Sequence, residues 1–110
     1  MRLIESILTN MALRPVSRTL DGFITGHGCD IASVIVALPT NVYVNGRQIA
    51  TLGAVSAPHT ILSGRVCVPH LSVVFTGSLS VFANGRPVAR VLDSIDSGAI
   101  ITGSTNVFCG

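Results

Sequence analysis

Three histidines and three cysteines are the residues of this 110-residue chain best suited to bind a metal or to act as nucleophiles. The histidines, His27, His59 and His70, all lie in segments that we predict to be loops. Three is an odd number of cysteines, which argues against a purely disulfide framework. A metal site is therefore one hypothesis, and a thiol or zinc hydrolase is another.

An enzyme is the weaker of these two hypotheses. No candidate nucleophile lies at the predicted start of a helix or in a strand-to-helix elbow, and no carboxylate lies in a recognisable motif. Asp30, next to Cys29, is more simply explained as a turn residue. We therefore expect a protein without catalytic residues.

A repeated hairpin must position these side chains. Val-Tyr-Val-Asn-Gly-Arg begins at residue 42, Val-Phe-Ala-Asn-Gly-Arg begins at residue 81, and a partial copy, Val-Phe-Cys-Gly, occupies 107–110. Asn-Gly tolerates the two positive φ angles of a type I′ turn, so each full copy predicts two short antiparallel strands. Isolated hairpins are marginal in water, so the hairpins must pack on one another.

The remaining segments predict further short strands and one extension. Residues 1–20 lie outside the repeat, and their apolar spacing at Leu3, Ile4, Ile7, Leu8 and Met11 fits a short helix, with a docking strand as the alternative. Pro and Gly indicate that the junction over 55–69 is a loop. We expect an N-terminal extension over 1–20 and one all-β domain over 21–110, with strands at 31–38, 71–76 and 99–102.

Composition excludes several classes of function. Hydrophobic residues make up 48% of the chain and charged residues only 11%, below the ~25% of typical soluble domains. Either a dense β core or a partner covering much of the surface explains this. The net charge is +2 without a basic run, so no nucleic-acid partner is expected. The start, Met1–Glu5, is not typical of a signal peptide, which predicts synthesis in the cytoplasm.

The repeat motifs resemble the PAAR-repeat family over residues 25–110. The resemblance lies in Val-Asn-Gly-Arg followed by small residues, Gly-Ser-x-x-Val-Phe, an early His-Gly, and Arg90-Val-Leu-Asp93. Pro87–Arg90 stands where the family's Pro-Ala-Ala-Arg lies, whereas Gln48–Thr51 departs from it. The resemblance implies a small cone of tandem β-hairpins with a pseudo-threefold base formed by Val-Tyr-Val, Val-Phe-Ala and Val-Phe-Cys.

The resemblance also implies a function and partners. Such a cone caps the trimeric β-helical spike of a contractile injection machine, either a phage tail or a type VI secretion system. It touches the target membrane transiently, helps to breach it, and could recruit separate effectors. A metal-free β-sheet adaptor that associates with itself is the alternative, and metal content distinguishes the two.

A structural Zn²⁺ at the apex, held by three histidines and one cysteine, is the last implication. By this resemblance His27, His59 and His70 are three ligands. Ser97 occupies the usual cysteine position, and a neutral serine is a poor zinc ligand. Cys67, three residues before His70, is the fourth ligand that we favour, because this spacing lets both side chains reach one ion; Cys29 and Cys109 are the alternatives.

Overall fold

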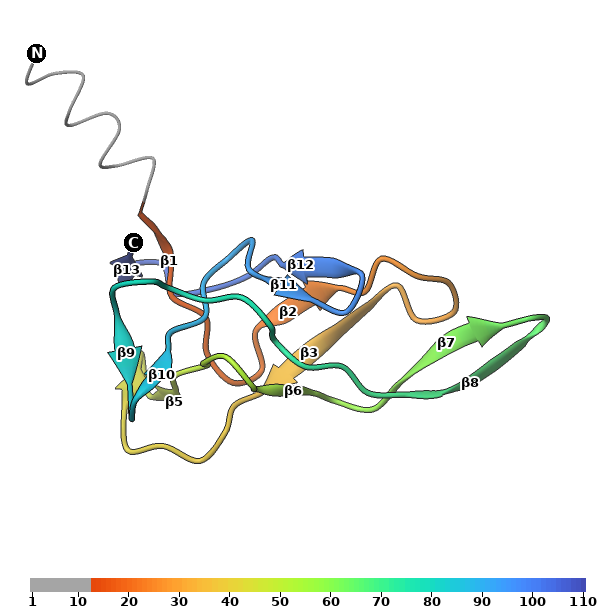
Figure 1. The fold of residues 1–110 in the computed structure, drawn as a ribbon, viewed down its shortest axis with the longest axis horizontal. Helices are drawn as coiled ribbons and strands as arrows, with labels where there is room; N and C mark the ends of the chain where they lie inside the picture. Colours follow the sequence, from red (N-terminus) through yellow and green to blue (C-terminus); the bar gives the residue numbers. More distant parts are fainter. Residues whose placement is uncertain (1–12) are drawn as a thin grey trace, which may run out of the picture.

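The protein is described by a computed structural model over residues 13–110, and these residues form short strands without helices (Figure 1). No helix in this part of the chain could therefore cross a membrane. The helix expected within residues 3–11 lies outside the described residues. The strands are β1 (Arg14–Pro15), β2 (Gly22–Ile24), β3 (Ala32–Val36), β4 (Tyr43–Val44), β5 (Arg47–Gln48), β6 (Val55–Ser56), β7 (His59–Ser63), β8 (Val66–His70), β9 (Phe82–Ala83), β10 (Arg86–Pro87), β11 (Ser94–Ile95), β12 (Gly98–Ile100) and β13 (Phe108–Cys109).

Both predicted Asn-Gly hairpins are confirmed. β4 pairs with β5 and β9 pairs with β10, each antiparallel and joined by two residues. Asn45 and Asn84 have φ values of 54° and 52°, and both following glycines have 76°. These are the positive angles that a type I′ turn requires, which explains why Asn-Gly occupies both turns.

A third pair of strands, similar to the two hairpins, is formed by the two ends of the described chain. β1 pairs with β13, so that Pro15 faces Phe108 just as Pro87 faces Phe82. Figure 1 shows β1 and β13 at the same end of the molecule as β9 and β10. Within residues 13–20, described here and expected to belong to the extension, Arg14 and Pro15 thus pair with the last strand of the cone, and the boundary expected at residue 21 stays a prediction.

The three hairpins meet around a pseudo-threefold axis. Ser17 donates its backbone N–H to Ala89, Ala89 donates to Ala50, and Ala50 donates to Ser17, each at an N···O distance of 2.9 Å. All three residues are fully buried, so only small side chains fit where the three segments converge. This ring confirms the all-β, pseudo-threefold architecture expected from the repeats.

A turn follows each of the three ring residues in the chain. After β1 and after the second Asn-Gly hairpin, an arginine begins the turn and an aspartate ends it: Arg18 with Asp21, and Arg90 with Asp93. Each aspartate accepts the arginine's backbone N–H at 2.7 Å and also binds its guanidinium group. The turn after the first Asn-Gly hairpin has Thr51 and Ala54 at these places and keeps only the hydrogen bond from the Ala54 backbone N–H to the Thr51 carbonyl, which the other two turns also have. Two buried ion pairs thus fix two of the three turns.

A curled sheet between the three strand pairs and the β7–β8 end of the molecule carries the main core. Its strand order is β11-β12-β2-β3-β6. The strand expected at 31–38 is shorter, Ala32–Val36, and only Ile35 within it is buried. The segment at 71–76, expected to be a strand, makes only isolated bridges at Val73 and Val74. The core consists of Phe23, Ile35, Ala50, Ala54, Val74, Ala89, Ile95 and Ile100.

A projecting hairpin replaces the loop expected at 55–69. β7 and β8 pair along five residues each, with His59 opposite His70 at the base. Figure 1 shows this hairpin at the end of the molecule opposite to β9 and β10. Pro and Gly suggested a loop, but Gly64 occupies the hairpin turn with φ of 62°, and Pro69 lies near the end of β8. Three of the candidate ligands, His59, Cys67 and His70, are therefore on strands.

Candidate metal centre

Four side chains converge at the base of the β7–β8 hairpin: His27, His59, His70 and Asp96. Their ligand atoms all lie within 4.8 Å of one another. His27 lies in the loop between β2 and β3, His59 begins β7 and His70 ends β8. Asp96 occupies the two-residue turn between β11 and β12. Three separate parts of the chain thus supply the group.

The Asp96 carboxylate faces all three rings. Its Oδ2 lies 2.8 Å from Nε2 of His27 and 2.9 Å from Nε2 of His59, and its Oδ1 lies 3.3 Å from Nε2 of His70. The side chains of His59 and Asp96 are 2% and 5% exposed, whereas that of His70 is 29% exposed. The group is therefore largely closed to water and most open at His70.

The other ring nitrogens determine which tautomers fit. Nδ1 of His27 lies 3.0 Å from the carbonyl oxygen of Gly28, and Nδ1 of His59 lies 3.0 Å from that of Ala57. A carbonyl oxygen only accepts, so each Nδ1 carries a proton. In a neutral ring the Nε2 lone pair then points at the Asp96 carboxylate, which is also an acceptor. A positive charge must lie between them, either as protons on the rings or as a cation.

The pKa values reflect the same convergence. The hydrogen bond to the Gly28 carbonyl raises the pKa of His27, and the Asp96 carboxylate adds to this effect against the opposing effect of burial. Burial alone would raise the pKa of Asp96, but hydrogen bonds from His59, His27 and His70 outweigh it and hold that pKa below its usual value. The site therefore favours an ionised carboxylate that faces positive charge.

This donor set fits a zinc ion. Zn²⁺ takes imidazole nitrogens and carboxylate oxygens at ~2.0–2.2 Å in tetrahedral sites, and four such groups are present. The Nδ1 contacts of His27 and His59 are the outer hydrogen bonds that usually orient metal-binding imidazoles. Four such groups around one ion would leave no open position, as in structural zinc sites.

A family model described as the PAAR motif matches residues 25–103. The chain belongs to the PAAR motif family. A curated relative, double-stranded DNA deaminase toxin A of Burkholderia cenocepacia (strain H111), is 39% identical over 79 residues. That match covers 69% of this chain but only 5% of the toxin, so the similarity is confined to a small part of the relative.

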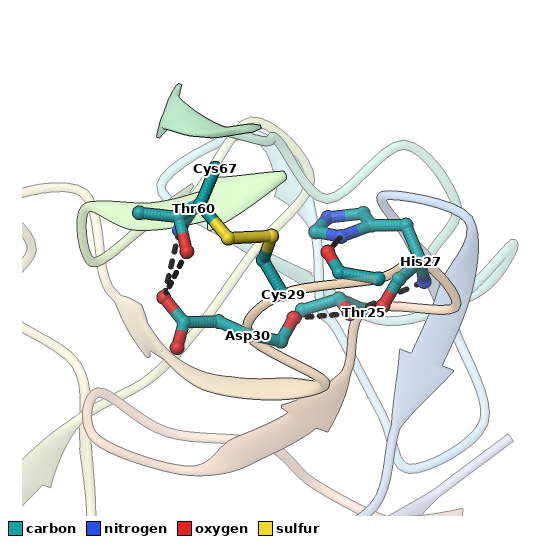
Figure 2. Close-up of a disulfide and its surroundings, with 7 residues drawn as sticks. Thr25, His27, Cys29, Asp30, Thr60 and Cys67 are labelled. Atoms are coloured by element: carbon teal, nitrogen blue, oxygen red, sulfur yellow. Dashed lines mark hydrogen bonds between the residues drawn. A yellow bond between two sulfur atoms is a disulfide. The ribbon is translucent and has the colours of Figure 1, made fainter. Parts of the chain in front are cut away.

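The fourth member of the group differs from the residue expected in this PAAR protein. Cys67, our favoured ligand, is bonded through sulfur to Cys29 and therefore has no free thiolate (Figure 2). Cys109, the other alternative, is a buried free cysteine in β13 at the opposite end of the cone. Ser97 is exposed and is not in the group. Asp96, the residue before it, completes the group instead.

Sequence reasoning missed Asp96 because the search favoured soft ligands. A signal was nevertheless present, since Asp96 follows a buried strand and begins a tight turn. It adopts φ of 58°, a left-handed conformation that aspartate tolerates better than most residues. The turn is held by Ser97, whose backbone N–H donates to the Thr25 carbonyl at 2.9 Å. This bond ties the Asp96 turn to the loop that carries His27.

Proposed function

We propose that this protein caps the blunt end of a trimeric β-helical spike in a contractile injection machine. The observation that carries the proposal is a set of three aromatic side chains at equivalent positions in the three hairpins. Tyr43, Phe82 and Phe108 are 59%, 55% and 49% exposed. Exposed aromatic clusters mark interaction surfaces, and three equivalent aromatics match a partner with three identical subunits.

Hydrogen bonds between the hairpins support a preformed docking base. Asn45 accepts from the hydroxyl of Ser104 at 2.6 Å, at the start of the third repeat. Asn84 donates to Asn41, at the start of the first repeat, at 3.1 Å. The hydroxyl of Ser78, at the start of the second repeat, donates to the carbonyl of Gly110. Each hairpin end thus binds the next repeat, which lowers the entropy cost of docking.

We further propose that His27, His59, His70 and Asp96 hold a structural Zn²⁺. The ion would link three parts of the chain at a point where few apolar side chains are available. Its binding free energy would then contribute to folding. The same four residues give the protein no catalytic water position, in keeping with the structural character of PAAR proteins.

The cellular role follows as part of the same proposal. A narrow apex and a wide base suit a tip that contacts the target membrane while the base stays on the spike. We propose that the chain is made in the cytoplasm and assembled onto a tail or secretion spike. The toxin relative carries a PAAR-like segment within a much longer chain, which supports a role in effector delivery.

Binding to the cognate spike trimer tests the proposal. Native mass spectrometry should show one cone on three spike chains, and the triple variant Tyr43→Ser, Phe82→Ser, Phe108→Ser should lose the complex. A matched control removes three exposed apolar side chains from the other end: Ile31→Ser, Leu62→Ser and Val66→Ser. Equal binding by the aromatic triple variant would overturn the proposal. Self-association without a spike complex would favour the adaptor alternative.

A further inference from the structure

We propose that the Cys29–Cys67 disulfide is a redox clamp that controls how tightly the apex retains its metal. This inference rests on the proposed metal site. It assigns a function to two cysteines that neither bind the metal nor lie in the core. Figure 2 shows the disulfide beside His27 and the paired Asp30 and Thr60.

The β7–β8 hairpin needs such an attachment. Every residue from Leu62 to Cys67 is exposed. In the described chain the hairpin pairs with no strand of the central sheet. A two-stranded hairpin with so little burial is marginal in water. Its conformation therefore depends on the few bonds that connect it to the rest of the cone.

Apart from the contacts of His59 and His70 with Asp96, those bonds lead to the loop between β2 and β3. Asp30 accepts from the backbone N–H of Thr60 at 2.7 Å and from its hydroxyl at 2.9 Å. Leu62 donates its backbone N–H to the Gly28 carbonyl at 3.2 Å. The Cys29–Cys67 disulfide is the covalent member of this set and attaches the loop to β8. Without it, and without a metal ion, only exposed hydrogen bonds to the loop and the contacts of the two histidines with Asp96 would hold the hairpin.

The same two segments carry the histidines. Cys29 lies two residues after His27, and Cys67 lies three residues before His70. His59 faces His70 across the hairpin. The disulfide therefore fixes the hairpin that supplies two ligands against the loop that supplies a third. Cys29 also holds a left-handed backbone, with φ of 73°, which residues other than glycine rarely adopt.

The redox step balances as an ordinary thiol–disulfide exchange. The S–H bonds of Cys29 and Cys67 are lost, one S–S bond forms between them, and their two protons pass to the two thiols released when the S–S bond of the oxidant breaks. The two electrons reduce the disulfide of the oxidant, which is oxidised glutathione or a dithiol oxidase. A chain made in a reducing compartment would keep both thiols free and would close the clamp in an oxidising one.

Oxidation should therefore tighten metal binding. Outer contacts that only orient ligands typically change metal affinity by ~10–100-fold, so we expect zinc to bind at least about 10-fold more weakly to the reduced protein. Tighter zinc binding by the reduced protein would have a different cause. If the freed Cys67 thiolate became a ligand, reduction would strengthen zinc binding.

The test measures zinc affinity by competition with a chromophoric chelator. Protein oxidised with glutathione disulfide is compared with protein kept reduced by a phosphine, and with Cys29→Ser and Cys67→Ser. Cys109→Ser is the control and should keep the full redox response. Hydrogen exchange of the β7–β8 amides, measured without metal, gives a second readout and should be slower in the oxidised protein.

The outcomes separate the clamp from the metal site. Weaker zinc binding and faster exchange in the reduced protein support the clamp. Equal zinc affinity in both states overturns the clamp and leaves the metal site intact, and tighter binding on reduction overturns it in favour of Cys67 ligation. Absence of zinc binding in every form overturns the metal site and the clamp with it.

Discussion

Arg14 lies directly opposite Cys109 in the antiparallel pair of β1 and β13. Arg47 lies opposite Val44 in the same way within the first Asn-Gly hairpin. Three similar pairs of antiparallel strands therefore surround the axis. Two of them are hairpins joined by an Asn-Gly turn, whereas no turn connects β1 to β13. The third pair depends on contacts between residues far apart in the sequence. The ring of Ser17, Ala50 and Ala89 therefore holds all three pairs together.

The buried ion pair beside that ring should be essential for stability. Asp21 binds the backbone and guanidinium group of Arg18 and also accepts from the hydroxyl of Thr102 at 2.9 Å. Asp21→Asn leaves the buried guanidinium without its counter-charge and should lower the free energy of unfolding by about 3 kcal/mol. Urea unfolding measures this loss. Asp30→Asn, at an exposed carboxylate, should cost less; an equal cost would contradict the argument.

The same carboxylate should make the fold sensitive to acid. Burial would raise the pKa of Asp21, but hydrogen bonds from Arg18 and Thr102 hold it below its usual value of 3.8. Ionised Asp21 therefore stabilises the fold above that pH, and the stabilisation is lost as pH falls through the lowered pKa. Chelator-treated wild type should lose more stability below about pH 4 than Asp21→Asn does. Parallel pH profiles would refute this origin of acid sensitivity.

A pair of glycine variants tests the packing of the apex. A Cβ on Gly98 would lie 1.9 Å from the carbonyl oxygen of Ile24, so Gly98→Ala must separate β12 from β2. We expect a loss of about 3 kcal/mol or more. Gly85 has φ of 76° but open space around it, so Gly85→Ala should cost only about 1 kcal/mol. Thermal unfolding measures both, and a reversed order would contradict the packing.

Local sequence signals predicted the hairpins well because their turns depend on adjacent residues. Asn45-Gly46 determines its own turn, and the same holds for the second copy. The third hairpin was missed because its strands come from both ends of the described chain. The signal was visible: Arg-Pro-Val-Ser-Arg at 14–18 closely matches Arg-Pro-Val-Ala-Arg at 86–90. Only the tertiary pairing shows that both segments do the same thing.

The group of three histidines and Asp96 was predictable in part. The three histidines were found because few residues in the chain bind metals well. The fourth member depends on distance in three dimensions, which sequence spacing does not give. Cys67 lies close to His70 in sequence, yet alternation along β8 and the bond to Cys29 take it away from the group. Asp96 lies 26 residues from His70 and reaches it through the β11–β12 turn.

Substitutions at Asp96 should separate ligand chemistry from fold. Asp96→Asn replaces a carboxylate with a neutral amide and should weaken zinc binding by more than about 100-fold, beyond the effect of an outer contact. Asp96→Cys supplies a thiolate and should keep tight binding. Chelator competition measures both. Ser97→Ala, next to Asp96 but outside the group, is the control. Unchanged affinity in Asp96→Asn would remove Asp96 from the ligand set.

Elemental analysis of the purified protein is the measurement to make first. We predict one zinc per chain in the wild type, loss of zinc in His59→Ala, and retention in Cys67→Ser. Wild-type protein without stoichiometric metal would contradict the apex site. Zinc lost from Cys67→Ser but kept in Asp96→Asn would return the fourth position to cysteine.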